Sequence, residues 1–190
     1  MRTFSLNQNI IDEVIKISLS AGKAILDIYE TNYDIKIKDD FSPLTEADVL
    51  SHQIILSSLR NLTPKIPILS EESSRISFKD RAKWREYWLV DPLDGTKEFI
   101  KKNGEFTTNI ALISENRPVF GVIYAPAINQ IYWGSELNGS FMKLDNKNIQ
   151  RIRVNEKQGL KVNVVSSRSH KTGAEKDFLR KIGDHEEHQV

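Results

Sequence analysis

The chain has 190 residues, 39% of them hydrophobic, which suffices for one large domain or for one domain and part of another. Its 27 basic and 26 acidic residues nearly cancel, so charge favours neither a nucleic acid polymer nor an anionic membrane as the main partner. The absence of cysteine excludes disulfides and thiolate metal sites. Without a signal-peptide pattern or an apolar stretch of membrane-spanning length, we expect a cytoplasmic protein with no integral membrane segment.

Two amphipathic helices are predicted in the first third of the chain. Apolar residues recur at helical spacing from about residue 9 to residue 32, so this first helix should cover a sheet. The second helix is expected to end near Leu62. Thr45 is placed to cap its N-terminus, and Asp48 lies in its first turn, where negative charge is favourable.

Apolar segments around and after these helices predict strands. Short strands are expected at 35–37 and at 66–69, with a polar turn at 39–43. Tyr87 to Val90 forms a further apolar strand. An antiparallel meander with a turn at 115–118 is then predicted from four runs of strand-like residues, at 107–114, 119–125, 128–133 and 139–144.

The last part of the chain predicts the beginning of an α/β unit. An apolar strand at 162–165 is followed by a helical pattern that continues to residue 182. A polar stretch at 155–159 separates this unit from the meander. We therefore expect an N-terminal α+β domain at 1–155 and the start of a C-terminal α/β domain at 156–190.

The most informative segment is Asp91 to Phe99, which directly follows an apolar strand. Asp91 and Asp94 are spaced so that both carboxylates can converge on hard cations. Gly95 and Thr96 then open a helix, whose N-terminal N–H groups and dipole favour an anion such as phosphate. Taken alone, the same residues fit a surface turn in which Asp and Gly only satisfy backbone geometry.

Two further acidic segments precede this motif, with Asp48 near the start of the second helix and Glu71 after the strand at 66–69. In this order the three segments resemble the Mg-dependent, lithium-sensitive phosphatase superfamily that includes inositol monophosphatase. Within it, the chain is most similar to the bacterial 3′(2′),5′-bisphosphate nucleotidase family. The segments that carry this likeness are 42–48, 69–72, 87–100, 103–107, 109–113, 121–126 and 167–170.

The resemblance implies an inositol-monophosphatase-like fold, a layered α/β sandwich (αβαβα) whose first part is an α+β domain that binds metal and phosphate. It also implies a metal site. Glu71, Asp91 and Asp94, together with the main-chain carbonyl of Leu93, would bind two or three Mg ions. These ions would neutralise phosphate charge and lower the pKa of bound water.

The same resemblance assigns the catalytic and substrate-binding residues. Thr96 and Asp48 would orient or deprotonate the attacking water, and Glu71 would share in catalysis. Asp48 has a structural alternative, because a carboxylate at a helix start also stabilises the helix dipole. The substrate-binding set implied by the resemblance, including the amides of Gly95 and Thr96 that would hold the phosphate, is Glu71, Leu93, Asp94, Gly95 and Thr96.

The substrate implied by the resemblance is 3′-phosphoadenosine 5′-phosphate, a small-molecule nucleotide bisphosphate that would be converted to AMP and phosphate in support of sulfate assimilation. Peripheral attachment to the cytoplasmic face of the inner membrane stays open, and the sequence leaves the oligomeric state undetermined. One alternative is an inositol or sugar monophosphatase, since the catalytic residues would be the same. Another is a catalytically impaired remnant that binds metal or a partner.

The remnant alternative rests on a missing motif. Relatives carry Trp-Asp-x-x-Ala-Gly, whose aspartate completes the second metal site, and this chain has no such segment. The chain therefore resembles a relative truncated at its C-terminus, with the C-terminal part of the fold incomplete. The strand at 162–165 is accordingly expected to lack its sheet partners and to expose apolar edges.

Other residues are assigned mainly structural roles. Glu72 is either a second acid beside the site or a solvated side chain, and Lys97 and Glu98 are expected to form an exposed helical pair. Arg168 and His170 are expected to be solvated or structural. The tail at 185–188 lacks the spacing of a zinc-binding helix and is expected to fray. The aromatic residues expected to pack around the central strand are Trp84, Tyr87 and Trp88.

Overall fold

The computed structural model divides the chain into two compact units, residues 1–152 and 153–190, which are described separately. The residues that the structure describes are 5–31, 34–37, 43–73, 76–145, 147–154, 162–166 and 173–189. Three predicted features lie wholly or mostly outside the described residues, namely the turn at 39–43, of which only Pro43 is described, the polar stretch at 155–159 and the segment at 167–170 with Arg168 and His170.

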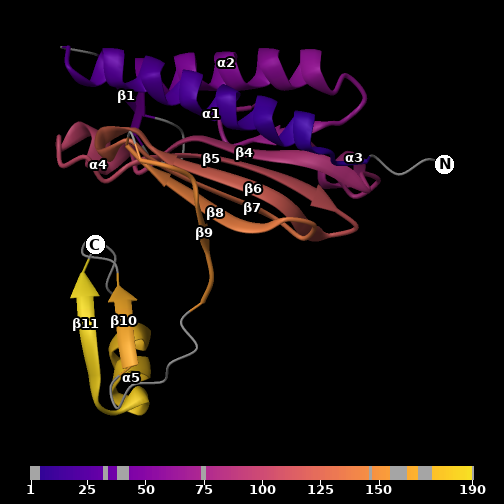
Figure 1. The fold of residues 1–190 in the computed structure, drawn as a ribbon. Helices are drawn as coiled ribbons and strands as arrows, with labels where there is room; N and C mark the ends of the chain where they lie inside the picture. Colours follow the sequence, from indigo (N-terminus) through magenta and orange to yellow (C-terminus); the bar gives the residue numbers. More distant parts are fainter. Residues whose placement is uncertain are drawn as a thin grey trace. The chain divides into compact units, whose positions relative to one another are not determined.

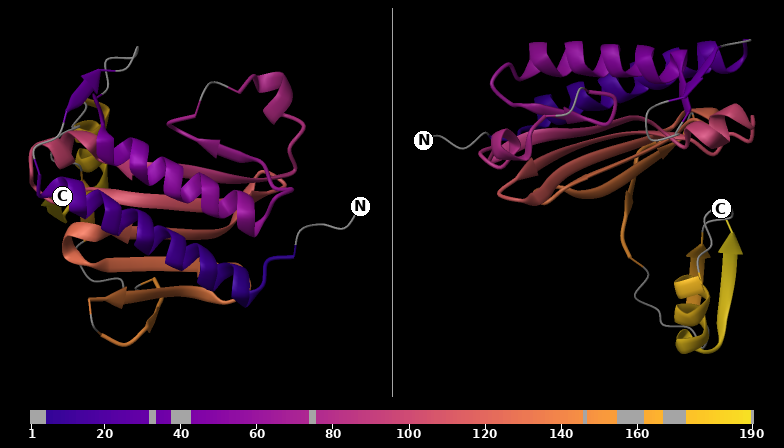
Figure 2. Two further views of the ribbon diagram at one scale, coloured as in Figure 1. Left: turned by 90° about the horizontal axis from the view of Figure 1, so that it is seen from above. Right: turned by 180° about the vertical axis from the view of Figure 1, so that it is seen from behind.

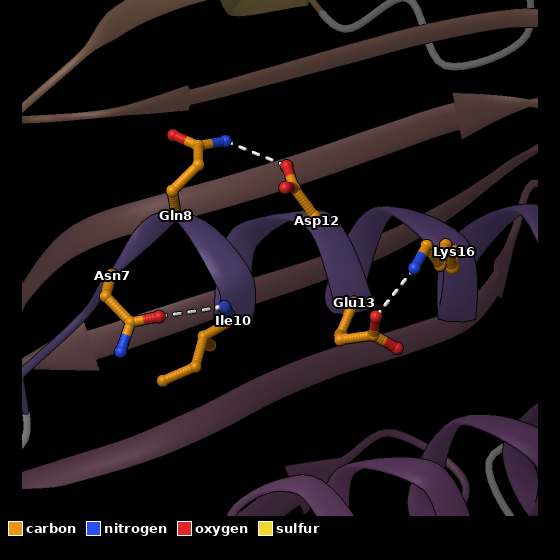
Figure 3. Close-up of polar contacts among 6 residues, drawn as sticks. All are labelled: Asn7, Gln8, Ile10, Asp12, Glu13 and Lys16. Atoms are coloured by element: carbon orange, nitrogen blue, oxygen red, sulfur yellow. Dashed lines mark hydrogen bonds and ion pairs between the residues drawn. The ribbon is translucent and has the colours of Figure 1, made fainter.

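Both predicted helices are confirmed, as α1 (Gln8–Tyr29) and α2 (Glu46–Leu62), and they lie side by side on one face of a sheet (Figures 1 and 2). The side chain of Asn7 caps α1 by accepting a hydrogen bond from the backbone N–H of Ile10 at 3.1 Å (Figure 3). Thr45 is the N-cap residue of α2, as predicted. Such caps satisfy amides of the first turn that have no partner within the helix.

Seven strands form the sheet in the order β3-β4-β5-β6-β7-β8-β9. All neighbours pair in the antiparallel direction except β3 and β4, which are parallel. The predicted four-strand meander is thus confirmed as the central part of the sheet, which β4 and the parallel β3 extend on one side and β9 extends on the other. The strands are β3 (Ile68–Ser70), β4 (Glu86–Asp94), β5 (Thr107–Ser114), β6 (Arg117–Ala125), β7 (Gln130–Ser135), β8 (Gly139–Leu144) and β9 (Gln150–Ile152).

Several predicted boundaries shift. The turn between β5 and β6 has two residues instead of four, because Glu115 and Asn116 both take positive φ angles, 47° and 63°, as a tight hairpin requires. Ile128 belongs to a short 3-10 helix, η1 (Pro126–Ile128), and not to β7. Short elements complete the first unit: β1 (Ile35–Ile37), β2 (Pro43–Thr45), α3 (Phe78–Arg81) and α4 (Thr96–Ile100).

The core lies between the helices and the sheet because alternate residues of each strand face the helices. On β4, Trp88 is fully buried in this core, whereas its neighbour Leu89 is 42% exposed on the other face. The indole N–H of Trp88 donates to the hydroxyl of Thr63 at 2.9 Å, which confirms that this aromatic residue packs in the core. At Gly22 of α1, an added Cβ would lie 2.4 Å from the ring of Tyr124, so glycine permits the close approach of helix and sheet.

The second unit contains β10 (Val162–Ser166), α5 (Gly173–Ile182) and β11 (His185–Gln189). The two strands pair in parallel, with Val162 opposite His185, and α5 is the crossover that a parallel pair needs. Two predictions are therefore wrong: the tail forms a strand instead of fraying, and the strand at 162–165 has a sheet partner. The predicted exposure of apolar residues on this strand is confirmed, because Val162 and Val165 are exposed. Among the described residues of both units, no helix is long and apolar enough to cross a membrane.

Candidate active site

The acidic motif lies within β4, which continues to Asp94 instead of ending at Val90 as predicted. Asp91 is opposite Asn109 of β5 and Asp94 is opposite Thr107, so β4 takes three steps where β5 takes two. This extra residue is a β-bulge. Side chains three positions apart in a regular strand point to opposite faces, but a one-residue bulge brings them to the same face. Pro92 lies in the bulge, where its missing N–H breaks no ladder hydrogen bond.

Glu71 reaches the same region because it directly follows β3. Its backbone N–H donates to the carbonyl of Val90 at 3.0 Å, which continues the parallel pairing of β3 with β4 and places Glu71 beside Asp91. Burial, followed by the negative charges of Glu71 and Asp94, raises the pKa of Asp91 from its usual 3.8 to about 7. The structure thus brings the three predicted metal-binding carboxylates into electrostatic contact.

The carboxylate of Asp91 fits a divalent cation. Its Oδ1 atom is buried and has no hydrogen-bond partner among the described residues, a costly state unless another ligand satisfies it. Carboxylate and carbonyl oxygens are the ligands that hard cations prefer. In the described part of the chain, no three acidic or imidazole side chains already surround one point as a complete ligand set. The acids thus form a partial set that further oxygens would complete.

The carbonyl of Pro92 is held by two fully buried hydroxyl groups. The hydroxyl of Ser51, on α2, donates to this oxygen at 2.7 Å, and that of Thr108, on β5, donates at 3.3 Å. A bulge takes a carbonyl out of the regular ladder, and a buried carbonyl needs a partner. Ser51 therefore connects the bulge to the helix layer, and Thr108 connects it to the neighbouring strand. Sequence reasoning missed both, because neither is part of the acidic motifs.

Asp48 and Thr96 are brought together across 48 residues of sequence. The hydroxyl of Thr96 donates to Oδ1 of Asp48 at 3.0 Å and approaches the carbonyl of Leu93 at 3.2 Å. The other oxygen of Asp48 accepts from the backbone N–H of Thr45 at 2.7 Å and from its hydroxyl at 2.6 Å. The fully buried Asp48 therefore completes the helix cap and also accepts a hydrogen bond from Thr96.

Gly95 shapes the turn between β4 and α4. Its φ of 91° lies in the left-handed region, and an added Cβ would lie 2.7 Å from the carbonyl oxygen of Glu105. The helix that follows has only five residues, so the predicted dipole contribution to anion binding is small and the first-turn amides remain the relevant donors. The predicted pair of Lys97 and Glu98 is replaced by an ion pair of Glu98 with Lys101 at 3.5 Å.

Asn109 is a third residue that sequence reasoning did not assign to the site. Its side-chain Nδ2 donates to Oδ2 of Asp94 at 3.1 Å. The period-two alternation along β5, once the pairing with β4 is known, places Asn109 on the same face as Asp91. The sequence alone lacks this register, so nothing in it distinguished Asn109 from the other polar residues of the strand.

Comparison with known proteins agrees with the fold and the site. Residues 6–189 match the model of the Inositol monophosphatase family. The chain is 44% identical over 178 residues, 93% of its length, to the 3′(2′),5′-bisphosphate nucleotidase CysQ of Escherichia coli O6:H1, and covers 70% of that protein. The corresponding protein of Buchnera aphidicola is 40% identical over 184 residues, with 92% of this chain and 65% of that protein covered.

Solved structures are similar as well. The crystal structure of CysQ from Bacteroides thetaiotaomicron, a bacterial member of the inositol monophosphatase family, superposes with a TM-score of 0.80 at 35% identity, over 99% of this chain and 74% of that one. An IMPase/NADP phosphatase solved with Mg²⁺ and phosphate has the same fold, with a TM-score of 0.73 at 18% identity, over 93% of this chain and 66% of that one. The chain belongs to the inositol monophosphatase family, and the predicted layered α+β fold is confirmed.

Proposed function

We propose that this protein is a Mg²⁺-dependent phosphomonoesterase that hydrolyses 3′-phosphoadenosine 5′-phosphate to AMP and inorganic phosphate. The observation that carries the proposal is the buried, unpartnered Oδ1 of Asp91, placed among the carboxylates of Glu71 and Asp94 and close in sequence to Thr96. The nucleotide substrate is supported by the 44% identity to a bisphosphate nucleotidase over most of the chain.

Glu71, Asp91, Asp94 and the carbonyl of Leu93 would hold the cations. Bound Mg²⁺ would offset the charge of the phosphate and lower the pKa of a coordinated water. The raised pKa of Asp91 reflects its burial first and then the repulsion by Glu71 and Asp94, and a divalent ion would offset this repulsion. We propose two or three ions, because the cations that these carboxylates hold would have to stabilise both the attacking and the leaving oxygen.

Thr96 and Asp48 provide the path for the proton of the attacking water. The hydroxyl of Thr96 already donates to Oδ1 of Asp48, so it can accept a proton from water only as it passes its own to this carboxylate. The water oxygen then forms a bond to phosphorus while the bond to the ribose 3′ oxygen breaks, and that oxygen takes a proton from solvent. Amides of Gly95 and Thr96 would hold the phosphate oxygens during this exchange.

Parallel phosphate-release assays test the proposal. The purified chain is given 3′-phosphoadenosine 5′-phosphate or inositol 1-phosphate, each with Mg²⁺ and with EDTA. We expect release mainly from the nucleotide, only with Mg²⁺, and abolished by Asp94→Asn. Asn138→Ala is the matched control, because this exposed asparagine donates to Gln8 far along the chain from the acidic motif. Its activity should equal that of the unaltered protein.

Two other results would replace the proposal. Preferential hydrolysis of inositol 1-phosphate would assign an inositol or sugar monophosphatase. Mg²⁺ binding without release of phosphate from either compound would assign a protein that binds metal without turnover. We also propose that the protein acts in the cytoplasm on this small molecule. Fractionation of cells that express it then separates a cytosolic enzyme from one attached to the inner face of the membrane.

A further inference from the structure

Asn109 touches both halves of the bulge that presents the acids. In the ladder between β4 and β5 it lies directly opposite Asp91, before the bulge. Its side chain nevertheless donates to Oδ2 of Asp94, after the bulge, at 3.1 Å. Asn109 is thus paired with Asp91 in the strand ladder and hydrogen-bonded to Asp94 through its side-chain amide.

The orientation of this amide is determined by its two neighbours. An ionised carboxylate only accepts hydrogen bonds, so the group that faces Asp94 must be the Nδ2 donor. On the other side, the hydroxyl of Thr107 donates to Oδ1 of Asn109 at 3.1 Å. Reversing the amide would set Oδ1 against the Asp94 carboxylate and lose the bond to Asp94. Thr107 and Asp94, which face each other in the ladder, therefore hold Asn109 in one orientation.

A neutral donor has a specific advantage at this position. The bulge brings the side chains of Asp91 and Asp94 to the same face of β4, so repulsion between the two carboxylates would turn an unrestrained Asp94 side chain away from the cluster. A lysine or arginine could restrain it, but its charge would compete with a cation for the same carboxylates. The amide of Asn109 occupies one acceptor position of Asp94 without adding charge, and leaves its remaining lone pairs for a ligand.

We propose that Asn109 is a positioning residue for Asp94, oriented by Thr107, which prearranges this carboxylate for a divalent cation. The inference rests on the proposed function, because that function places the cation at these acids. Groups that hydrogen-bond to metal ligands typically change metal affinity by about 10- to 100-fold when they are removed. Since Asp94 is exposed and Asn109 is only half-buried, the lower end of this range is expected.

The test measures Mn²⁺ binding to the full chain by the electron paramagnetic resonance signal of the free ion, with Mg²⁺ as competitor. Asn109→Ala should weaken Mn²⁺ binding by about tenfold. Thr107→Val, which keeps the β-branched shape but removes the donor to the amide, should weaken it by a smaller factor. Asn138→Ala loses the same kind of amide hydrogen bond elsewhere and should bind Mn²⁺ like the unaltered protein.

A merely structural role of Asn109 would change the thermal midpoint of Asn109→Ala in EDTA. Under our inference this midpoint should instead equal that of the unaltered chain, and a higher Mn²⁺ concentration should restore nucleotide hydrolysis by the variant. Unchanged Mn²⁺ affinity in both variants would overturn the inference while leaving the proposed function intact. Failure of the unaltered chain to bind Mn²⁺ would overturn both. If Asn109→Ala does not fold, the result for Thr107→Val decides.

Discussion

Asp91 is the residue whose charge is most affected by the fold. Burial removes water from its carboxyl group, and Glu71 and Asp94 add like charges, so its pKa rises from 3.8 to about 7. A surface aspartate in a turn, the alternative that the motif alone allowed, would have no reason to show such a shift. The perturbed carboxyl therefore supports a functional site at the residue scale, because strongly shifted groups gather at such sites.

This shift predicts how the stability of the metal-free protein depends on pH. Between 3.8 and about 7 the folded state keeps a proton on Asp91 that the unfolded chain releases, so the free energy of unfolding falls as pH rises through this window. Urea unfolding in EDTA at about pH 5 and about pH 8 measures the effect. Asp91→Asn, which cannot ionise, should lack this contribution, and an identical pH dependence in both proteins would contradict the assignment.

The bulge in β4 places the two aspartates of the motif on the same face of the sheet. Without it, Asp91 and Asp94 would point to opposite faces of the sheet. Its geometry depends on the Pro92 carbonyl, which accepts hydrogen bonds from one helix of the covering layer and from the neighbouring strand. The position of the acids is therefore coupled to the packing of α2 on the sheet.

Removing the two hydroxyl donors tests this coupling. Ser51→Ala and Thr108→Val each leave the buried Pro92 carbonyl with one partner, so each should lower the free energy of unfolding by about 1 kcal/mol. The Ser51 bond is the shorter, at 2.7 Å against 3.3 Å, so its loss should cost more. The double variant should lose more than the sum, because the carbonyl is then unpaired. Strict additivity in urea unfolding would show that the two hydroxyls do not share this acceptor.

On the scale of the whole molecule, the site depends on segments that only the folded first unit brings together. Glu71 follows an edge strand, Asp48 lies at the start of α2, and Asp91 and Asp94 lie on β4. A cation at these acids would bind the folded chain and not the unfolded one. Metal binding should therefore stabilise this entire unit.

Mg²⁺ at about a hundredfold excess over its dissociation constant should add about 2.7 kcal/mol to the free energy of unfolding. For a chain of this size, that raises the thermal midpoint by roughly 5–11 °C. Asp94→Asn should abolish most of the increase, whereas Asn138→Ala should keep it. A calorimetric scan with and without Mg²⁺ gives the result, and an unchanged midpoint in the unaltered protein would argue against the metal site.

The sequence by itself determined the helices and the meander, and it named the acids that we propose for the site. Helix and strand periods, cap residues and the Asp-Pro-Leu-Asp-Gly-Thr segment are local signals, each written within a few adjacent residues. They were enough to place α1 and α2 to within a few residues and to name two groups of neighbours in the structure, Asp48 with Thr96, and Asp91 with Glu71 and Asp94.

Only the tertiary structure decided how these acids are oriented and which residues hold them in place. The bulge, the parallel pairing of β3, the partner strand β11 and the contacts of Ser51, Thr108 and Asn109 all depend on register between segments distant in the sequence. Local propensity carries no information about register, because a strand can pair in many ways until packing and buried hydrogen bonds select one. Nothing in the sequence therefore distinguishes the residues that position the acids, because only the fold places them beside the motif.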